Sequence, residues 1–236
     1  MSKYETFIFD LDDTLIDNNQ SVKYAFKIIL NKLGIKFNDE LLKKWLNFDT
    51  AYWYLWESAQ ITLPKSLKTK EDITTYLRAN RFVIFFNLNL ADAIDLNELF
   101  CNNLGVDIVE LEGASTLLKD LSPNHEIVIA TNGPKEAAHL KLEKTKLNKY
   151  ISSIVTSEEV GYSKPREEFF DYLYNKCKNK DKSKMLLIGD SLSTDILGGM
   201  NNGIDTCWYN PNNKPIPDRY NPTISINKLL QLTKKL

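Results

Sequence analysis

The chain has 236 residues, of which 43% are hydrophobic and 26% are charged, and this balance excludes wholesale disorder. Its 30 basic and 31 acidic side chains give a net charge of −1, which argues against a nucleic acid polymer as partner, because phosphate-tracking proteins need a clustered positive surface. Three scattered cysteines and two histidines argue against a disulfide framework and a histidine-rich metal centre.

The sequence contains neither a membrane-spanning apolar stretch nor an N-terminal export signal. No apolar stretch approaches the ~18 residues of a membrane-spanning helix. The N-terminus lacks the apolar segment of a secretory signal peptide. We therefore expect a cytoplasmic protein with no membrane partner.

The first predicted element is a strand at residues 6–9. This short apolar run ends at Asp10 and Asp12, which indicates a buried parallel strand that delivers carboxylates at its carboxyl end. A long helical region follows, with no strand-type alternation between about residues 20 and 106. Helical patterns cover about residues 22–33, 39–56, 71–90 and 95–104, with Gly34 placed to end the first of them.

From residue 126 onward, apolar runs alternate with helical patterns. Such alternation indicates βαβ units and a parallel sheet covered on both faces. The sequence thus predicts an α/β core, interrupted after its first strand by an all-helical insertion. Strands are predicted at 126–131, 154–156, 185–190 and 206–209, helices at 134–146, 167–178 and 194–202, and a proline-rich surface loop at 210–222.

Polar residues follow three of the predicted strands. Any one of them alone is more simply a loop acid or a helix cap. The carboxyl ends of parallel strands meet at one edge of a sheet, however, so together these side chains predict a ligand site. The pairs are Asp10 with Asp12, Thr131 with Asn132, and Asp190 with Asp195.

These segments resemble the four motifs of the haloacid dehalogenase-like (HAD) hydrolase superfamily, and they occur in the family's order. The resemblance implies a doubly wound, Rossmann-like parallel sheet core with an inserted all-helical cap domain. On this basis residues 1–17 and 108–236 form the core, and residues 18–107 form the cap. The motifs are Asp10-Leu11-Asp12-Asp13-Thr14, Thr131-Asn132-Gly133, Lys164-Pro165, and Gly189-Asp190-Ser191 continuing to Asp195.

The resemblance implies a Mg²⁺-dependent phosphomonoester hydrolase that works through an aspartyl-phosphate. Asp10 is then the nucleophile, and Asp12 is the acid that protonates the leaving alkoxide and the base that activates water. Asp10, Asp190 and the backbone carbonyl of Asp12 are expected to bind Mg²⁺, a cation that prefers oxygen ligands.

The remaining motif residues are expected to bind and orient. Lys164, Thr131 and the amides of Asn132 and Gly133 would hold the phosphoryl oxygens. Asp195 would lie behind them and orient Lys164 or a metal-bound water.

The helical insertion matches the cap of one branch of the family, in which caps close over the site. The chain looks most like the nucleoside 5′-monophosphate phosphatases of that branch, so the expected partner is a small phosphorylated substrate. Trp45, Trp53 and Trp56 either pack the helical bundle or stack on a nucleobase, and Arg78 and Arg81 either reach the substrate or lie on an exposed face.

Other members of the same fold remain as alternatives. A sugar-phosphate phosphatase or a phosphomutase would carry the same motifs. A metal-independent 2-haloacid dehalogenase is disfavoured, because such enzymes generally lack a carboxylate at the position of Asp12. A binding protein without activity is disfavoured by the intact acids and Lys164.

Overall fold

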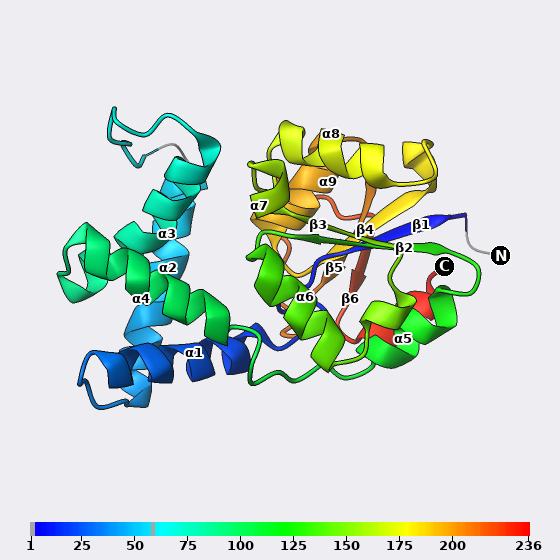
Figure 1. The fold of residues 1–236 in the computed structure, drawn as a ribbon. Coiled ribbons are helices and arrows are strands. Elements are labelled where there is room, and N and C mark those ends of the chain that lie inside the picture. Colours follow the sequence, from blue (N-terminus) through cyan, green and yellow to red (C-terminus); the bar gives the residue numbers. More distant parts are fainter. Residues whose placement is uncertain (1–2, 58–59) are drawn as a thin grey trace. The chain divides into compact units, whose positions relative to one another are not determined.

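The computed structural model of the chain describes residues 3–57 and 60–236 (Figure 1). The backbone divides into two compact units. Met1–Asn19 and Ile108–Leu236 form one of them, the α/β unit, and Gln20–Asp107 form the other, the helical unit.

The α/β unit contains a six-stranded parallel sheet in the order β3-β2-β1-β4-β5-β6. The chain runs from β1 outward to β3 and then returns to β4 on the other side of β1. Ligands of such sheets bind at this switch point, outside the carboxyl ends of the strands. The strands are β1 (Thr6–Phe9), β2 (Glu126–Thr131), β3 (Ser153–Thr156), β4 (Met185–Gly189), β5 (Asp205–Tyr209) and β6 (Ile224–Ile226).

Helices cover both faces of this sheet, which confirms the predicted doubly wound, Rossmann-like architecture (Figure 1). Side chains of a strand alternate between faces. Phe7 and Phe9 therefore pack on one face with α5 (Ala114–Leu121) and α6 (Lys135–Lys144), while Ile8 packs on the other face with α8 (Glu167–Lys176). Burial on both faces explains why the strands read as continuous apolar runs.

Short helical segments follow strands β3, β4 and β6. They are α7 (Ser157–Val160), the π-helical turn η3 (Leu192–Ile196) with α9 (Leu197–Asn201) directly after it, and the C-terminal 3₁₀ helix η4 (Leu229–Lys234). Helix α5, strand β6 and helix α7 were not predicted from the sequence; each is short, with three to eight residues.

The helical unit holds four long helices, α1 (Asn18–Lys32), which begins two residues before the unit boundary, α2 (Asp39–Glu57), α3 (Lys70–Phe86) and α4 (Leu90–Asn103). The predicted helix over 71–90 is wrong at its end. Asn87 adopts a left-handed conformation with φ 56° and closes α3. Asn89 then caps α4 by accepting a hydrogen bond from the Asp92 backbone, so the two predicted helices are separated at residues 87–89 rather than between residues 90 and 95.

Aromatic side chains fill the core of the helical unit. Trp45 is fully buried, and its ring stacks on Phe82 with centroids 4.9 Å apart and on Phe26 at 5.5 Å. This burial removes Trp45 from the set of predicted base-stacking residues and makes it part of the bundle core. Trp53 and Trp56 are half-buried, and for them the stacking role stays a prediction.

Arg81 also belongs to this core. Its guanidinium donates to Asp49 Oδ1 over 2.6 Å and lies over the rings of Trp53 and Phe82, 5.1 and 5.4 Å from their centroids. Arg81 is 6% exposed, so the expectation of a helix-surface arginine is wrong.

Among the described residues, no helix combines the length and apolar character needed to cross a membrane.

Candidate active site

Lys164 lies at the centre of the carboxyl edge of the sheet. Its side chain is 1% exposed, and its ammonium donates three hydrogen bonds. They go to Asp10 Oδ1 over 2.7 Å, to Asp195 Oδ1 over 2.6 Å and to the backbone carbonyl of Ala130 over 2.6 Å. The loop between α7 and α8 thus supplies a cation that joins the ends of β1, β2 and β4.

Asn132 holds the backbone of Lys164 in place. Its side-chain oxygen accepts from Lys164 N over 2.9 Å, and its Nδ2 donates to the Lys164 carbonyl over 3.1 Å. Ser157 in turn donates to the Asn132 carbonyl over 2.9 Å. The Asn132 side chain is therefore occupied in positioning Lys164, and its backbone amide is the group left for a ligand.

The turn after β2 folds back on its own threonine. Gly133 N donates to Thr131 Oγ1 over 3.0 Å, and Thr131 is buried. A β-carbon at Gly133 would lie 3.2 Å from both Thr131 Oγ1 and Asp12 Oδ2. The glycine thus lets this turn approach the Asp12 carboxylate closely.

Asp195 reaches Lys164 from η3. Asp195 Oδ1 accepts from Lys164, and its Oδ2 accepts from Ser191 N over 3.1 Å, so both carboxylate oxygens are occupied. Single π-helical turns of this kind often lie at functional sites. A β-carbon at Gly189 would lie 2.2 Å from Asp195 Oδ2, so only glycine at this position leaves room for the carboxylate.

Asp190 completes the group at the switch point of the sheet. Strands β1 and β4 are paired with Phe9 opposite Ile188, so Asp10 and Asp190 follow neighbouring strands almost level with each other. Carboxylate oxygens of Asp10, Asp190 and Asp195 lie within 4.8 Å of one another. Thr14 Oγ1 donates to Asp190 Oδ1 over 3.4 Å, and the Trp208 indole donates to the Asp190 carbonyl over 2.8 Å.

The charges of this group are unbalanced. Burial raises the pKa of Asp10 to about 7, with Lys164 opposing and Asp195 adding to the shift. Burial, followed by repulsion from Asp10, raises the pKa of Asp190 to about 8. Burial works against the charge of Lys164, but Asp10 and Asp195 together raise its pKa above the ordinary value. Three carboxylates thus surround one ammonium.

Asp12 lies beside this group with a cation of its own. Its carboxylate pairs with the ammonium of Lys141, a residue of α6 that is 2% exposed. Lys141 Nζ also donates to Asn18 Oδ1 over 3.3 Å. The structure therefore brings together Asp10, Asp190, Asp195 and Lys164 in one cluster, and it places Asp12 with Thr131 and Gly133.

Comparison with known proteins identifies the lineage of this arrangement. Residues 7–209 match the haloacid dehalogenase-like hydrolase family. The chain belongs to that family. The stretch that matches contains all four predicted motifs, the whole helical unit and most of the α/β unit.

Individual members of the HAD-like hydrolase family match over nearly the whole chain. Pyrimidine 5′-nucleotidase YjjG of Escherichia coli (strain K12) is 30% identical over 236 residues, which cover 99% of this chain and 98% of that protein. Pyrimidine 5′-nucleotidase PynA of Streptococcus pneumoniae is 29% identical, with 94% of this chain and 91% of that protein covered. This HAD hydrolase is thus an enzyme with nucleotidase relatives.

A solved structure agrees with the same family over the full length. The HAD-hydrolase YfnB of Bacillus subtilis, described as bound to magnesium, superposes with a TM-score of 0.87 at 27% identity and covers 100% of this chain and 99% of its own. A 2-haloacid dehalogenase from Pseudomonas syringae superposes at 0.69 with 22% identity, which shows a shared fold.

The donor set of this hydrolase fits a divalent cation. The Asp10 and Asp190 carboxylates are hard oxygen donors of the kind that Mg²⁺ prefers. The ligand role of the Asp12 carbonyl stays a prediction. A divalent cation would also balance the excess of carboxylates over ammonium groups. Asp195 fits the ligand role less well, because both of its oxygens already accept hydrogen bonds.

Lys141 and Thr14 are the site residues that motif reasoning missed. The signal for Lys141 was present in the sequence, because α6 presents the inward stripe Ala137, Ala138, Lys141 and Leu142. A lysine in such a stripe is buried and needs a partner. Thr14 was read only as part of the first motif, and it proves to be fully buried against Asp190.

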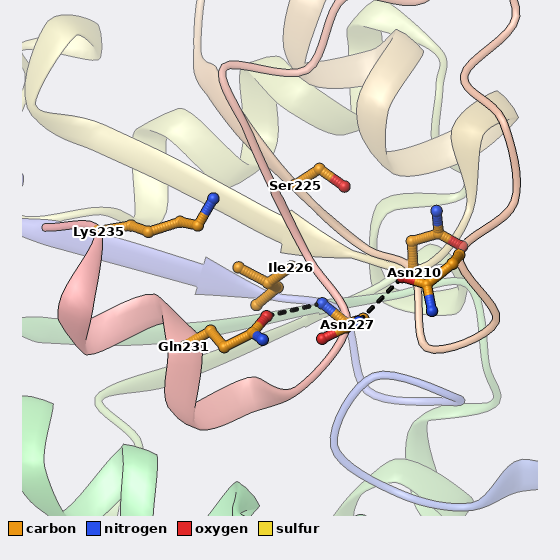
Figure 2. Close-up of a pocket in the computed structure, with 7 residues that line it drawn as sticks. Asn210, Ser225, Ile226, Asn227, Gln231 and Lys235 are labelled. Atoms are coloured by element: carbon orange, nitrogen blue, oxygen red, sulfur yellow. Dashed lines mark hydrogen bonds between the residues drawn. The ribbon is translucent and has the colours of Figure 1, made fainter.

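A separate hollow lies beside the ends of β5 and β6 (Figure 2). Its polar groups bond to one another: Asn227 N donates to Gln231 Oε1 over 3.0 Å, and Asn227 Nδ2 donates to Asn213 Oδ1 over 2.9 Å. The residues that line it include amides and Lys235 but no carboxylate. It therefore lacks the chemistry of the Lys164 cluster.

Proposed function

We propose that this hydrolase is a Mg²⁺-dependent phosphomonoester phosphatase that forms an aspartyl-phosphate on Asp10 and acts on nucleoside 5′-monophosphates. The observation that carries the proposal is the ammonium of Lys164, held by Asp10 and Asp195 with Asp190 close by. A carboxylate can attack a phosphate dianion only where positive charge compensates the repulsion. Lys164 supplies one such charge at the attacking group itself.

Mg²⁺ held by Asp10, Asp190 and the Asp12 carbonyl would supply the remaining positive charge against the phosphoryl oxygens. The chain's own groups hold the phosphoryl group from the other side. Thr131 Oγ1, the amides of Asn132 and Gly133, and Lys164 are donors on the same edge of the sheet. Lys164 Nζ donates to Asp10, Asp195 and the Ala130 carbonyl, and Gly133 N donates to Thr131 Oγ1, so each of these two groups would exchange one such bond for a phosphoryl oxygen when substrate binds.

The first step transfers the phosphoryl group to the enzyme. An Asp10 oxygen forms a bond to phosphorus, and the bond from phosphorus to the leaving oxygen breaks. The electron pair goes to that oxygen, which takes a proton from the Asp12 carboxyl group.

The second step releases phosphate. Water attacks phosphorus while the Asp12 carboxylate takes its proton, and the bond between phosphorus and Asp10 breaks to restore the carboxylate. Asp195 and Asn132 contact Lys164 rather than the substrate, so their part is to keep its ammonium in place through both steps.

The proposed substrate class draws support from the relatives and from the helical unit. Two relatives that match over nearly their whole length are pyrimidine 5′-nucleotidases. Trp53 and Trp56 are half-buried in the helical unit and offer rings on which a base could stack. Base–aromatic stacking contributes roughly 1–3 kcal/mol per base.

The experiment is a substrate panel with the purified protein. It includes pyrimidine and purine monophosphates and triphosphates, glucose 6-phosphate, phosphoglycolate and p-nitrophenyl phosphate, each with Mg²⁺ and with EDTA. We expect turnover that needs Mg²⁺, and kcat/KM values for monophosphates at least about tenfold above those for sugar phosphates. We expect deoxyuridylate or thymidylate among the best substrates and triphosphates among the poor ones.

The panel also separates the alternatives. A tenfold preference for a sugar phosphate would reject the nucleotidase proposal and leave the aspartyl-phosphate chemistry standing, and an isomerised product without free phosphate would indicate a phosphomutase. Full activity in EDTA would reject the metal role. Dehalogenation of a 2-haloacid, assayed beside the panel, with no turnover of any phosphate would reject the phosphatase proposal itself.

A further inference from the structure

Lys141 is a buried lysine with no part in the mechanism above. Its neighbours on the inner stripe of α6 are Ala137, Ala138 and Leu142, and its side chain is 2% exposed. Burying an ammonium is costly unless it is paired and hydrogen-bonded. Lys141 therefore keeps its place only through specific partners.

Those partners fix one oxygen of the Asp12 carboxylate. Lys141 Nζ donates to Asp12 Oδ1 and, over 3.3 Å, to Asn18 Oδ1 at the start of α1. The second oxygen, Asp12 Oδ2, lies toward the turn after β2, because a β-carbon at Gly133 would be only 3.2 Å away from it. The two carboxylate oxygens thus have different surroundings.

We propose that Lys141 is a positioning residue that occupies Oδ1 of Asp12 and thereby makes Oδ2 the oxygen that transfers the proton. The inference rests on the proposed phosphatase function and assigns a division of labour within it. Oδ2 faces the turn of Thr131 and Gly133, whose donors would hold the phosphoryl group. The proton is therefore delivered beside the bond that breaks.

The proton balance of both steps runs through Oδ2. In phosphorylation, the oxygen that leaves phosphorus with the electron pair takes the proton from Oδ2. In hydrolysis, Oδ2 takes a proton from water as the water oxygen bonds to phosphorus and Asp10 departs. Lys141 takes no part in this proton balance and acts only by donating to Asp12 Oδ1 and Asn18 Oδ1.

A role limited to folding would have a different signature. Alkoxide leaving groups need a proton, whereas p-nitrophenolate is a stable anion that leaves without one. Loss of a positioning residue for the acid must therefore reduce phosphorylation by alkyl phosphates selectively. Loss of a structural ion pair would reduce the kcat/KM values for both substrates by the same factor.

The test compares kcat/KM of Lys141→Met for deoxyuridine 5′-monophosphate and for p-nitrophenyl phosphate. We expect a loss of roughly 10- to 100-fold for the alkyl phosphate and of less than about threefold for the aryl phosphate. Lys141→Arg should recover part of the loss. Lys144→Met, an exposed lysine on the same helix, serves as the control and should leave both values unchanged.

Two further measurements keep the outcome clear. With p-nitrophenyl phosphate, Lys141→Met should show a burst of p-nitrophenolate, because hydrolysis still needs Asp12 as a base. Adding Lys141→Met to Asp12→Asn should cause no further loss, since both changes remove the same function. If Lys141→Met does not fold, Asn18→Ala should also lower kcat/KM for the alkyl phosphate more than for the aryl phosphate, by a smaller factor.

Equal losses for both substrates, or no loss for either, would overturn the positioning role while the phosphatase function stands. Independent, multiplicative effects of Lys141→Met and Asp12→Asn would overturn it as well. A wild-type protein inactive on both phosphates would overturn the proposed function and this role together.

Discussion

Lys164 of the α/β unit and Arg81 of the helical unit are both buried cations, but their surroundings differ. Lys164 contacts two carboxylates, Asp10 and Asp195, and a third, Asp190, lies close by. Arg81 contacts one carboxylate, Asp49, donates to the Arg78 carbonyl and to Asn97 Oδ1, and lies among aromatic rings. One cation stands in an excess of negative charge, and the other is neutralised.

This difference indicates that Lys164 serves the reaction and that Arg81 serves the packing of the helical unit. A neutral pair enclosed by rings needs nothing further and contributes to the stability of the bundle. Burial, with repulsion between the neighbouring carboxylates added to it, raises the pKa of Asp10 and Asp190, and the excess of carboxylates favours the binding of another cation. The comparison thus predicts that substitutions around Lys164 affect turnover, and that substitutions around Arg81 affect unfolding.

The largest expected effect is that of Lys164→Met. It removes the ammonium from Asp10 and Asp195 and, among the residues that the structure describes, the cation that pairs with the attacking carboxylate. We expect kcat to fall by roughly 10³-fold or more, measured as phosphate release at saturating Mg²⁺. A kcat within a fewfold of the wild-type value would contradict the expectation that substitutions around Lys164 affect turnover.

Gly189→Ala tests whether the function of Lys164 depends on its hydrogen bond to Asp195. The new β-carbon would lie 2.2 Å from Asp195 Oδ2, so the carboxylate must move and Lys164 loses one of its acceptors. We expect kcat to fall roughly 10- to 100-fold. Gly203→Ala is the matched control: its φ of +69° brings backbone strain but the site is open, so it should lower the Tm without lowering kcat.

Arg81→Met should lower the stability of the fold and leave turnover nearly unchanged. It leaves Asp49 without its ion pair and removes a cation from the aromatic core, so we expect the free energy of unfolding to fall by about 2–4 kcal/mol. The decrease should appear as a lower Tm in calorimetry, with kcat for p-nitrophenyl phosphate within about threefold of wild type. A large loss of kcat with unchanged Tm would assign Arg81 to the substrate instead.

The smallest expected effect is a pH-dependent stabilisation by Mg²⁺. Folded Asp10 and Asp190 have pKa values raised to about 7 and about 8. In the unfolded chain both values return to about 3.9. The unfolded chain therefore releases more protons in this range, and the metal-free fold loses stability as pH rises toward 8.

Mg²⁺ binds the ionised carboxylates, so the rise in Tm that it causes should grow between about pH 5.5 and about pH 8.5. Thermal unfolding with Mg²⁺ and with EDTA at both pH values measures it. Asp190→Asn should abolish most of the rise, whereas Arg81→Met should keep it. A rise that shrinks with increasing pH would contradict the assignment of these carboxylates to the metal.

Much of this picture could be predicted from the sequence, because strands buried on both faces leave continuous apolar runs. The ends of these runs point to Asp10, Thr131 and Asp190 without any structure. Helix boundaries were harder. The division between α3 and α4 depends on the left-handed Asn87 and the cap at Asn89, and apolar periodicity continues across both.

For a buried residue that acts through a partner, the sequence could not indicate which residue the partner is. Lys141 in α6 pairs with Asp12 in the loop after β1. The two residues lie far apart in the sequence, and no local sequence pattern indicates that they pair. The same holds for the aromatic residues of α2. Their spacing fits packing within the bundle and stacking on a nucleobase equally well. The contact of Trp45 with the Phe82 ring shows that Trp45 packs within the bundle.

The central claim is that Asp10 carries the phosphoryl group, and trapping the intermediate tests it most directly. Asp12→Asn keeps the nucleophile but lacks the base for hydrolysis, so p-nitrophenyl phosphate should convert the protein to a stable phosphoenzyme. Quenching, reduction with borohydride and peptide mass spectrometry should then find homoserine in place of Asp10. A phosphoryl group on any other side chain, or release of p-nitrophenolate with no modified residue at position 10, would contradict the account.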